Sequence, residues 1–223
     1  MSDKSTPYHV PHQKRSRESL ERLLDAAEEC ISASGIEGFT IADVVSRADL
    51  SVGAFYARFP DKTALLHAVQ DRFHERTEPA IHKQMLRYAA EAEGLAAAVE
   101  RLIDILSKHF DQTRELSRAF MMNSVFDPLM RTQGERVNRE RRRVFAAVLL
   151  EYRNEIGHDD PLMAIDMAYA MYSAVVRGTL VFGTQHELFY DVTEQTITRE
   201  IKRAITLYLY GDDSSFAYSP STR

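Results

Sequence analysis

Two short helical segments joined by a turn of only three residues constrain the fold of this chain more than any other feature. Thr40 and Asp43 have the spacing of a capping box, which predicts a helix over residues 41–47. Ser51 follows the turn and can cap a second helix, predicted over residues 52–59 and ended by a proline. Two such helices, packed on a third, form a helix-turn-helix unit.

The third helix of this unit precedes the pair and carries one apolar stripe that recurs with the period of an α-helix. The stripe consists of Leu20, Leu23, Leu24, Ala27 and Ile31. Gly35 is expected to end this helix. A fourth helix is predicted after its cap, Asp61, and Pro79 is expected to stop or kink it. Its buried face would comprise Leu65, Leu66, Val69 and Phe73.

The second helix of the pair has an unusual outer face. Its inward residues are expected to be Phe55 and Phe59, and its outward ones Val52, Gly53, Ala54, Tyr56, Ala57 and Arg58. Glycine in a helix costs about 0.5–1 kcal/mol relative to alanine, so Gly53 indicates that something approaches this backbone closely. Small residues would let the helix reach a phosphate or a base edge, with Tyr56, Arg58 and Lys62 available to phosphates. The simpler interpretation is that Tyr56 only covers the core and that Arg58 is solvated.

The overall charge gives little support to nucleic-acid binding. The net charge is −5, and residues 1–73 hold nine Lys and Arg against eleven Asp and Glu, so any DNA-binding surface has to be local. The single cysteine, Cys30, excludes an intrachain disulfide and favours a reducing, cytoplasmic location. The N-terminus has no apolar leader, and Arg177 interrupts the most apolar run, residues 168–183, so neither export nor membrane insertion is expected.

The run from Ser16 to Phe73 resembles the DNA-binding domain of the TetR family of bacterial transcriptional regulators. The matching pattern is an alanine-rich helix that ends in Gly, a Phe-Thr cap, an Ala-x-Leu-Ser turn, and Gly-Ala-Phe-Tyr-x-x-Phe followed by Lys-x-x-Leu-Leu. The resemblance implies phosphate contacts by Thr40, Tyr56 and Lys62. It also implies that four residues lie in the major groove: Ser51, Val52, Gly53 and Ala54.

The sequence departs from the family pattern at three positions. Asp49 stands where a glycine is common, and an Asp can accommodate the left-handed conformation of that turn. Val52 replaces a frequent polar or basic residue, so that base recognition there would be by apolar contact. Arg58 replaces a more usual aromatic residue or His and would add charge near the DNA backbone.

Beyond Pro79 the chain is predicted to be helical throughout, so the expected fold class is all-α. The stripes that support this are Leu95, Val99, Leu102, Ile103 and Leu106, and then Val137, Arg141, Val144, Phe145, Val148 and Tyr152. The arginines of residues 139–143 are interpreted chiefly as a solvated face. The expected division is a flexible arm over 1–14, a helix-turn-helix domain over 15–62, a connecting helix over 63–79, an effector-binding and dimerisation domain over 80–210, and a flexible tail over 211–223.

Two further helices indicate a subunit interface. The helix from Pro161, capped by Asp160, to Gly183 is apolar nearly all round. The last helix is predicted to follow Asp191, with Glu194 as its capping-box partner. A monomer would expose a large apolar surface here, which suggests a homodimer. The resemblance likewise implies that these two helices pair across a two-fold axis, so that two recognition helices read a palindrome.

The resemblance also implies a site for a small, largely apolar effector in the C-terminal region. Candidates with large, adaptable side chains are Phe110, Phe120, Met121, Met122, Phe126, Tyr169, Met171 and Tyr172. For each of these alone, an ordinary core position is the simpler interpretation. Arg177 is added because a charge in an apolar stretch needs a partner. That partner would be an anionic ligand, an internal carboxylate such as Asp166 or Asp104, or water.

The chain lacks the common enzyme motifs, and it is not expected to be an enzyme or to need a cofactor. His67, His74 and His82 lie near one helical face, but they are interpreted as exposed or capping residues rather than as a metal site. The favoured function is a homodimeric DNA-binding repressor released by a ligand. The alternative is a DNA-binding protein of the same fold that answers to a protein partner or organises the chromosome.

Overall fold

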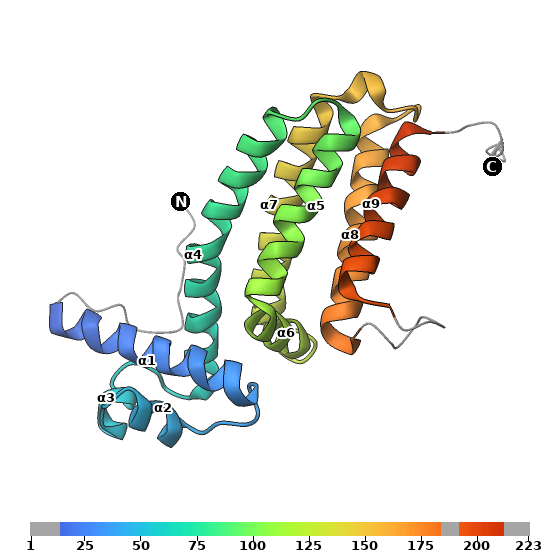
Figure 1. Cartoon of the computed structure of the whole chain (residues 1–223). Helices are drawn as coiled ribbons and strands as arrows, with labels where there is room; N and C mark the ends of the chain where they lie inside the picture. The colour runs from blue at the N-terminus through green and yellow to red at the C-terminus, as the bar shows by residue number, and fades with distance from the viewer. Residues whose placement is uncertain (1–13, 184–191, 212–223) are drawn as a thin grey trace, which may run out of the picture. The chain divides into compact units, whose positions relative to one another are not determined.

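The computed structural model of the chain describes residues 14–183 and 192–211. Those residues form helices joined by turns, without a strand, which confirms the all-α fold class (Figure 1). The α-helices are α1 (Lys14–Ser34), α2 (Ile41–Arg47), α3 (Val52–Tyr56), α4 (Lys62–Ala90), α5 (Leu95–Gln112), α6 (Arg114–Asn123), α7 (Pro128–Leu150), α8 (Pro161–Phe182) and α9 (Glu194–Tyr210), with a 3₁₀ helix η1 (Arg153–Glu155). None of these helices is long and apolar enough to cross a membrane.

The helices pack into two compact units. Among the described residues, the first unit holds 14–77 and 113–137, and the second holds 78–112, 138–183 and 192–211. Each unit has its own hydrophobic core, the first from α1 to α4 with α6 and the second from α5 and α7 to α9. Since α4 and α7 each begin in the first unit and end in the second, both helices contribute to both cores.

The local sequence signals of the first unit are confirmed. The helix α2 has the predicted bounds, and Thr40 and Asp43 form the full capping box. The Ser51 side chain caps α3 by accepting a backbone N–H of its first turn at 3.1 Å. Gly35 follows α1 with φ 71°, and Asp49 adopts φ 51° in the turn before α3. Asp49 therefore takes the left-handed conformation for which glycine is more common.

Two helix ends differ from the predictions. The helix α3 ends at Tyr56 rather than near residue 59. The reason is that the N–H of Arg58 donates to the Phe55 carbonyl only three residues back, which tightens the end of the segment into a turn. Pro79 does not stop α4, which continues to Ala90.

In the second unit, α8 and α9 pack side by side (Figure 1). The predicted cap of α8 is confirmed, since the Asp160 carboxylate accepts the N–H of Met163 at 3.0 Å. The predicted cap of α9 is wrong. Thr193 caps this helix by accepting the N–H of Thr196 at 3.2 Å, and Glu194 is the first helical residue. The predicted cap, Asp191, lies outside the described residues.

Gly157 closes the second unit at the end of α9. Its N–H donates to the Leu209 carbonyl at 3.0 Å. A Cβ at this position would collide with the carbonyl oxygen of Tyr210. The loop before α8 can therefore approach the end of α9 only because residue 157 has no side chain.

Candidate nucleic-acid interface

The outer face of α3 forms a single solvent-facing surface. Phe55 and Phe59 are fully buried, as predicted, and turn the rest of the segment outward. Val52 is 49% exposed and Tyr56 is 55% exposed. The Tyr56 ring packs edge-on against Phe55, with the ring centroids 5.3 Å apart. The remaining predicted contact residues of this surface are the exposed Ser51 and Gly53 and the half-buried Ala54.

Nothing among the described residues requires a glycine at position 53. Its backbone lacks the positive φ that favours glycine, and a Cβ built there would meet only the Ser51 hydroxyl, at 3.8 Å. That distance is an ordinary van der Waals contact. The absence of a side chain at Gly53 therefore has no explanation in the packing of the described residues.

The hydroxyl of Thr40 is already engaged within the capping box. It donates to the Asp43 carboxylate at 2.7 Å and accepts the N–H of Asp43 at 3.2 Å. The hydrogen bonds from the Thr40 hydroxyl and from its backbone N–H hold the pKa of Asp43 below its usual range. A stably ionised carboxylate thus lies beside the predicted phosphate contact at Thr40.

Two side chains that were predicted to contact DNA phosphates have hydrogen-bond partners inside the protein. Lys62 donates to the Phe39 carbonyl at 2.6 Å, and its ammonium lies 4.1 Å from the centroid of the Phe39 ring. Arg58 is half-buried rather than outward, because its guanidinium donates to the Ala54 carbonyl at 2.8 Å and to Ser16 at 3.3 Å. Both cations therefore brace the first unit, and their DNA contacts stay predictions.

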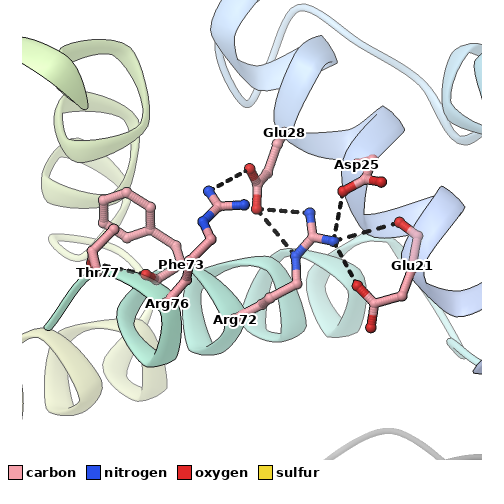
Figure 2. Close-up of polar contacts among 7 residues, drawn as sticks. All are labelled: Glu21, Asp25, Glu28, Arg72, Phe73, Arg76 and Thr77. Atoms are coloured by element: carbon pink, nitrogen blue, oxygen red, sulfur yellow. Dashed lines mark hydrogen bonds and ion pairs between the residues drawn. The ribbon is translucent and has the colours of Figure 1, made fainter. Parts of the chain in front are cut away.

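A network of ion pairs between α4 and α1 was not predicted from the sequence. We call it the Arg72 cluster, and it comprises Glu21, Asp25, Glu28, Arg72 and Arg76 (Figure 2). The Arg72 guanidinium donates to Glu28 at 2.7 Å, to Asp25 at 2.8 Å and to Glu21 at 3.0 Å. Arg76 donates to the second oxygen of Glu28 at 2.9 Å. Burial lowers the pKa of Arg72, but the charge and hydrogen bonds of Glu28 outweigh it, and the net shift is upward.

This network offsets part of the negative charge of the first unit. The three carboxylates lie on one face of α1, and each contacts Arg72. A further α1 carboxylate, Glu29, pairs with Arg47 of α2 at 3.3 Å. Much of the negative charge of the first unit is thus neutralised locally, which reduces its repulsion of a polyanion.

The predicted effector residues are divided between the two units. In the first unit are Phe120, Met121, Met122 and Phe126, and in the second are Phe110, Tyr169, Met171, Tyr172 and Arg177. Phe120 lies in the first core, with its ring 5.6 Å from that of Phe73, whereas Phe126 is 87% exposed. Arg177 is exposed and its Nε donates to the Ser173 carbonyl at 3.2 Å. The internal carboxylates considered for it have other partners, since Asp166 pairs with Arg142 and Asp104 with Lys202.

A charged cluster is buried in the second unit. We call it the Arg141 cluster, and it comprises Glu78, His82, His109, Phe110 and Arg141. Arg141 donates from Nε and Nη2 to the two oxygens of Glu78, and the two side chains are only 8% and 11% exposed. The Nη2 atom lies 3.4 Å from Nε2 of His109, and the guanidinium carbon lies 5.3 Å from the Phe110 centroid. The Nε2 atom of His82 lies 3.6 Å from the Glu78 carboxylate.

The electrostatics of this cluster follow from its burial. Burial lowers the pKa of Arg141, but the hydrogen bonds and charge of Glu78 outweigh that effect and raise it, so Arg141 stays protonated. The arginines of residues 139–143 are predicted to form a solvated face, and the buried Arg141 departs from that prediction. The sequence does contain a sign that Arg141 is buried, because this residue lies on the apolar stripe of α7 between Val137 and Phe145.

Two predicted tyrosines of α8 lie in the same core as this cluster. Tyr169 donates to the Asn138 side chain at 2.9 Å, and burial raises its pKa to about 12. Burial also raises the pKa of Tyr172, with a smaller opposing effect from nearby Ser107. The Tyr172 hydroxyl makes no hydrogen bond of acceptable geometry with the described residues.

The histidines do not form a common site in the structure. His67 is buried rather than exposed, and its Nε2 lies 2.6 Å from Asp127. Asp127 also accepts the N–H groups of Leu129 and Met130 at the start of α7. Within residues 14–183 and 192–211, no three His, Cys, Asp or Glu residues are grouped so that they could hold a metal ion.

Comparison with known proteins gives one consistent family. A model of the bacterial regulatory proteins of the tetR family matches residues 23–69. The HTH-type transcriptional regulator BetI of Cronobacter sakazakii is 31% identical over 188 residues, which are 82% of this chain and 88% of that protein. The HTH-type transcriptional repressor KstR of Mycolicibacterium smegmatis is 30% identical over 105 residues, or 47% of this chain and 52% of that protein.

Solved structures show the same fold. A TetR-family transcriptional regulator from Mesorhizobium loti superimposes with a TM-score of 0.69 at 17% identity, covering 88% of this chain and 98% of that one. GusR of Salmonella enterica superimposes with a TM-score of 0.59 at 20% identity, covering 86% of this chain and 95% of its own. The likeness therefore extends well beyond the helix-turn-helix segment.

Proposed function

The chain belongs to the TetR family of bacterial transcriptional regulators, and from this premise we propose that it is a repressor that binds a palindromic operator as a homodimer and dissociates when a small effector binds. Its relatives are transcriptional regulators rather than enzymes, and KstR is a repressor by name. Because its operator is chromosomal in this proposal, the protein would work in the cytoplasm.

The observation that carries the proposal is the open space around Gly53. A helix that had only to fold would gain about 0.5–1 kcal/mol from alanine there, and nothing within the described chain prevents that exchange. An external partner that lies against the helix backbone explains the glycine. The partner that fits a small, exposed face flanked by the Tyr56 hydroxyl is the edge of a DNA groove with its adjoining phosphates.

The apolar surface of α8 and α9 supports a homodimer. Its exposed members are Leu162, Met163 and Met167 on α8 and Leu207 and Tyr210 on α9. Side chains of this kind would be covered if the same two helices of a second copy packed against them, as the family resemblance implies. Two recognition helices related by a two-fold axis would then contact two half-sites of one operator.

The Arg141 cluster supports effector control from the second unit. It combines buried charges with Phe110, and it shares its core with Tyr169 and Tyr172. An effector bound there would bias α4, which begins at the helix-turn-helix and ends in the second unit. Effector and operator would then weaken each other's binding by the same factor.

The decisive experiment is a titration of the purified chain against the DNA that flanks its own gene, beside scrambled DNA, at two salt concentrations. Specific recognition predicts a preference of about a thousandfold for the native fragment. Gly53→Ala should weaken binding to that fragment by about tenfold or more, because a methyl group would stand between helix and groove. The same variant should be as resistant to urea as the wild type, or slightly more so.

Matched tyrosine variants separate a DNA contact from a general effect. Tyr56→Phe should weaken operator binding, because it removes one phosphate hydrogen bond. Tyr88→Phe changes an exposed tyrosine of the second unit and should leave binding unchanged. Full operator affinity in the Gly53→Ala and Tyr56→Phe variants would contradict the assignment of this face to DNA.

The oligomeric state can be tested separately by sedimentation. Leu207→Glu places a charge in the proposed interface, and it should convert the dimer to a monomer. Leu86→Glu is the control, since Leu86 is similarly exposed but lies on α4. A monomeric wild-type chain at micromolar concentration would contradict the homodimer.

A further inference from the structure

We propose that the Arg141 cluster binds the carboxylate of a small, largely apolar acid, and that this carboxylate replaces Glu78 as the partner of Arg141. The inference rests on the proposed effector control and names the chemical class of that effector. It is argued from three observations: the buried Arg141–Glu78 pair, the Tyr172 hydroxyl without a partner in the same core, and the aromatic side chains beside the pair.

The first observation is that the structure already displays the interaction that an acid would make. Arg141 holds the Glu78 carboxylate with Nε and Nη2, which is the two-point contact that suits a guanidinium and a planar carboxylate. A ligand carboxylate that takes the place of Glu78 would find the same donors already oriented. The buried site is therefore built for a carboxylate, whether it comes from the chain or from a ligand.

The second observation is a buried donor without a partner. The Tyr172 hydroxyl lies in the same core and makes no hydrogen bond of acceptable geometry with the described residues. A buried donor without a partner is costly, and an oxygen-rich ligand group would satisfy it.

The third observation is the apolar material beside the pair. The Phe110 ring lies under the guanidinium, and Phe145 packs against Tyr169 with the ring centroids 5.4 Å apart. An acid with an alkyl or aryl body would bury that body against these rings. A cationic ligand is disfavoured, because it would have to compete with Arg141 for Glu78 and remain beside the positive guanidinium.

The displaced Glu78 would not be left without a partner. His82, four residues further along α4, has its Nε2 3.6 Å from the Glu78 carboxylate, and its side chain is 25% exposed. The His82 imidazole can donate a hydrogen bond to the carboxylate and compensate it in part once Arg141 has turned to the ligand. The exchange therefore needs no isolated buried charge, which would otherwise prohibit it.

The test is calorimetric titration of the full chain with benzoate, hexanoate and decanoate, beside benzamide, hexanamide and decanamide. The acids should bind, and each amide should bind at least about tenfold more weakly than its acid. Glu78→Gln should strengthen the binding of the acids by about tenfold, because a neutral amide competes less well for Arg141. Arg142→Gln, which alters a half-exposed arginine paired with Asp166, should bind the acids like the wild type.

Three results would overturn the inference: amides that bind as tightly as the acids, a Glu78→Gln variant that binds acids no better than the wild type, or no acid binding by either protein. Titrations with the native DNA fragment keep the two proposals apart. Specific DNA binding without acid binding overturns only the carboxylate site. Acid binding without specific DNA binding overturns only the repressor function.

Discussion

The Arg72 and Arg141 clusters are both networks of arginine and carboxylate that involve α4, but they differ in exposure and in stoichiometry. In the Arg72 cluster, α4 supplies two arginines and α1 supplies three carboxylates, of which Glu21 and Asp25 are 61% and 63% exposed. In the Arg141 cluster, α4 supplies the carboxylate of Glu78, α7 supplies the arginine, and both are buried.

This difference decides what each network can do. Water and salt screen the Arg72 cluster. Its three carboxylates all contact Arg72, and Glu28 also contacts Arg76, so the loss of one carboxylate leaves the other contacts in place. In the Arg141 cluster one guanidinium and one carboxylate depend on each other, and the loss of either leaves a buried charge. The Arg72 cluster can therefore lose its contacts one at a time, each with a small loss of stability. The Arg141–Glu78 pair is either intact or broken.

The strongest test of this contrast is Arg141→Met. It should lower the free energy of unfolding by about 3–5 kcal/mol, because the buried Glu78 carboxylate would lose its two-point contact with Arg141. Urea unfolding followed by far-ultraviolet circular dichroism is suitable, since the chain has no tryptophan. Combining it with Glu78→Leu should recover most of the loss. A cost below about 1 kcal/mol for the single variant would show that the pair is not effectively buried.

Arg72→Gln should have a smaller effect that depends on salt. The free energy of unfolding is expected to fall by about 1–3 kcal/mol at low salt, because the paired side chains of Arg72 and Glu28 are largely buried. The difference from the wild type should shrink as sodium chloride rises to about 0.5 M, at which the screening length falls to a few ångströms. If the difference in unfolding free energy between Arg72→Gln and the wild type does not change with salt, the Arg72 cluster is not the more strongly screened of the two.

The His67–Asp127 pair is a third case, in which pH is the variable. Burial raises the pKa of Asp127, but the Met130 N–H and His67 outweigh it, and the net pKa is lowered. Its stabilisation is therefore present above the unfolded value of about 3.9 and is lost as pH falls through the lower folded pKa. Asp127→Asn should cost about 1 kcal/mol at pH 7 and progressively less in that acidic window. Asp159→Asn, at an exposed loop position, is the matched control.

The smallest effect is expected for Arg142→Met. Arg142 is adjacent to Arg141 in the sequence, but its pair with Asp166 at 3.2 Å is half exposed. Its loss should change the free energy of unfolding by less than about 1 kcal/mol. Equal urea midpoints for the Arg141→Met and Arg142→Met variants would mean that burial does not govern these pairs.

The local structure of the first unit could be predicted because its signals lie within a few residues of one another. Thr40 and Asp43 specify the start of α2, and Ser51 specifies the start of α3. The left-handed conformation of Asp49 was expected from the family resemblance, because a glycine is common at this position in the family. The residue types of the outer face of α3 were equally readable, although their DNA contacts stay predictions.

Long-range polar partners could not be predicted from one sequence. Arg58 contacts Ser16 at a separation of 42 residues, and Arg141 contacts Glu78 at a separation of 63. Periodicity assigns a residue to a face of its helix, but it does not identify the charge on another helix that meets it. For this reason the outward prediction for Arg58 and the solvated prediction for Arg141 both differed from the structure.

The middle of α4 has a mechanical consequence. Pro79 has no N–H to offer the carbonyl four residues back, and the Thr77 hydroxyl donates to the Phe73 carbonyl at 2.8 Å, a contact that tends to bend helices. Treated as an elastic rod, α4 is most compliant near these two residues. The segment from Thr77 back to Lys62 is about 23 Å long, so each degree of bending displaces its far end by about 0.4 Å. A rod of this kind amplifies a small rotation at one end into a displacement on the scale of a hydrogen bond at the other.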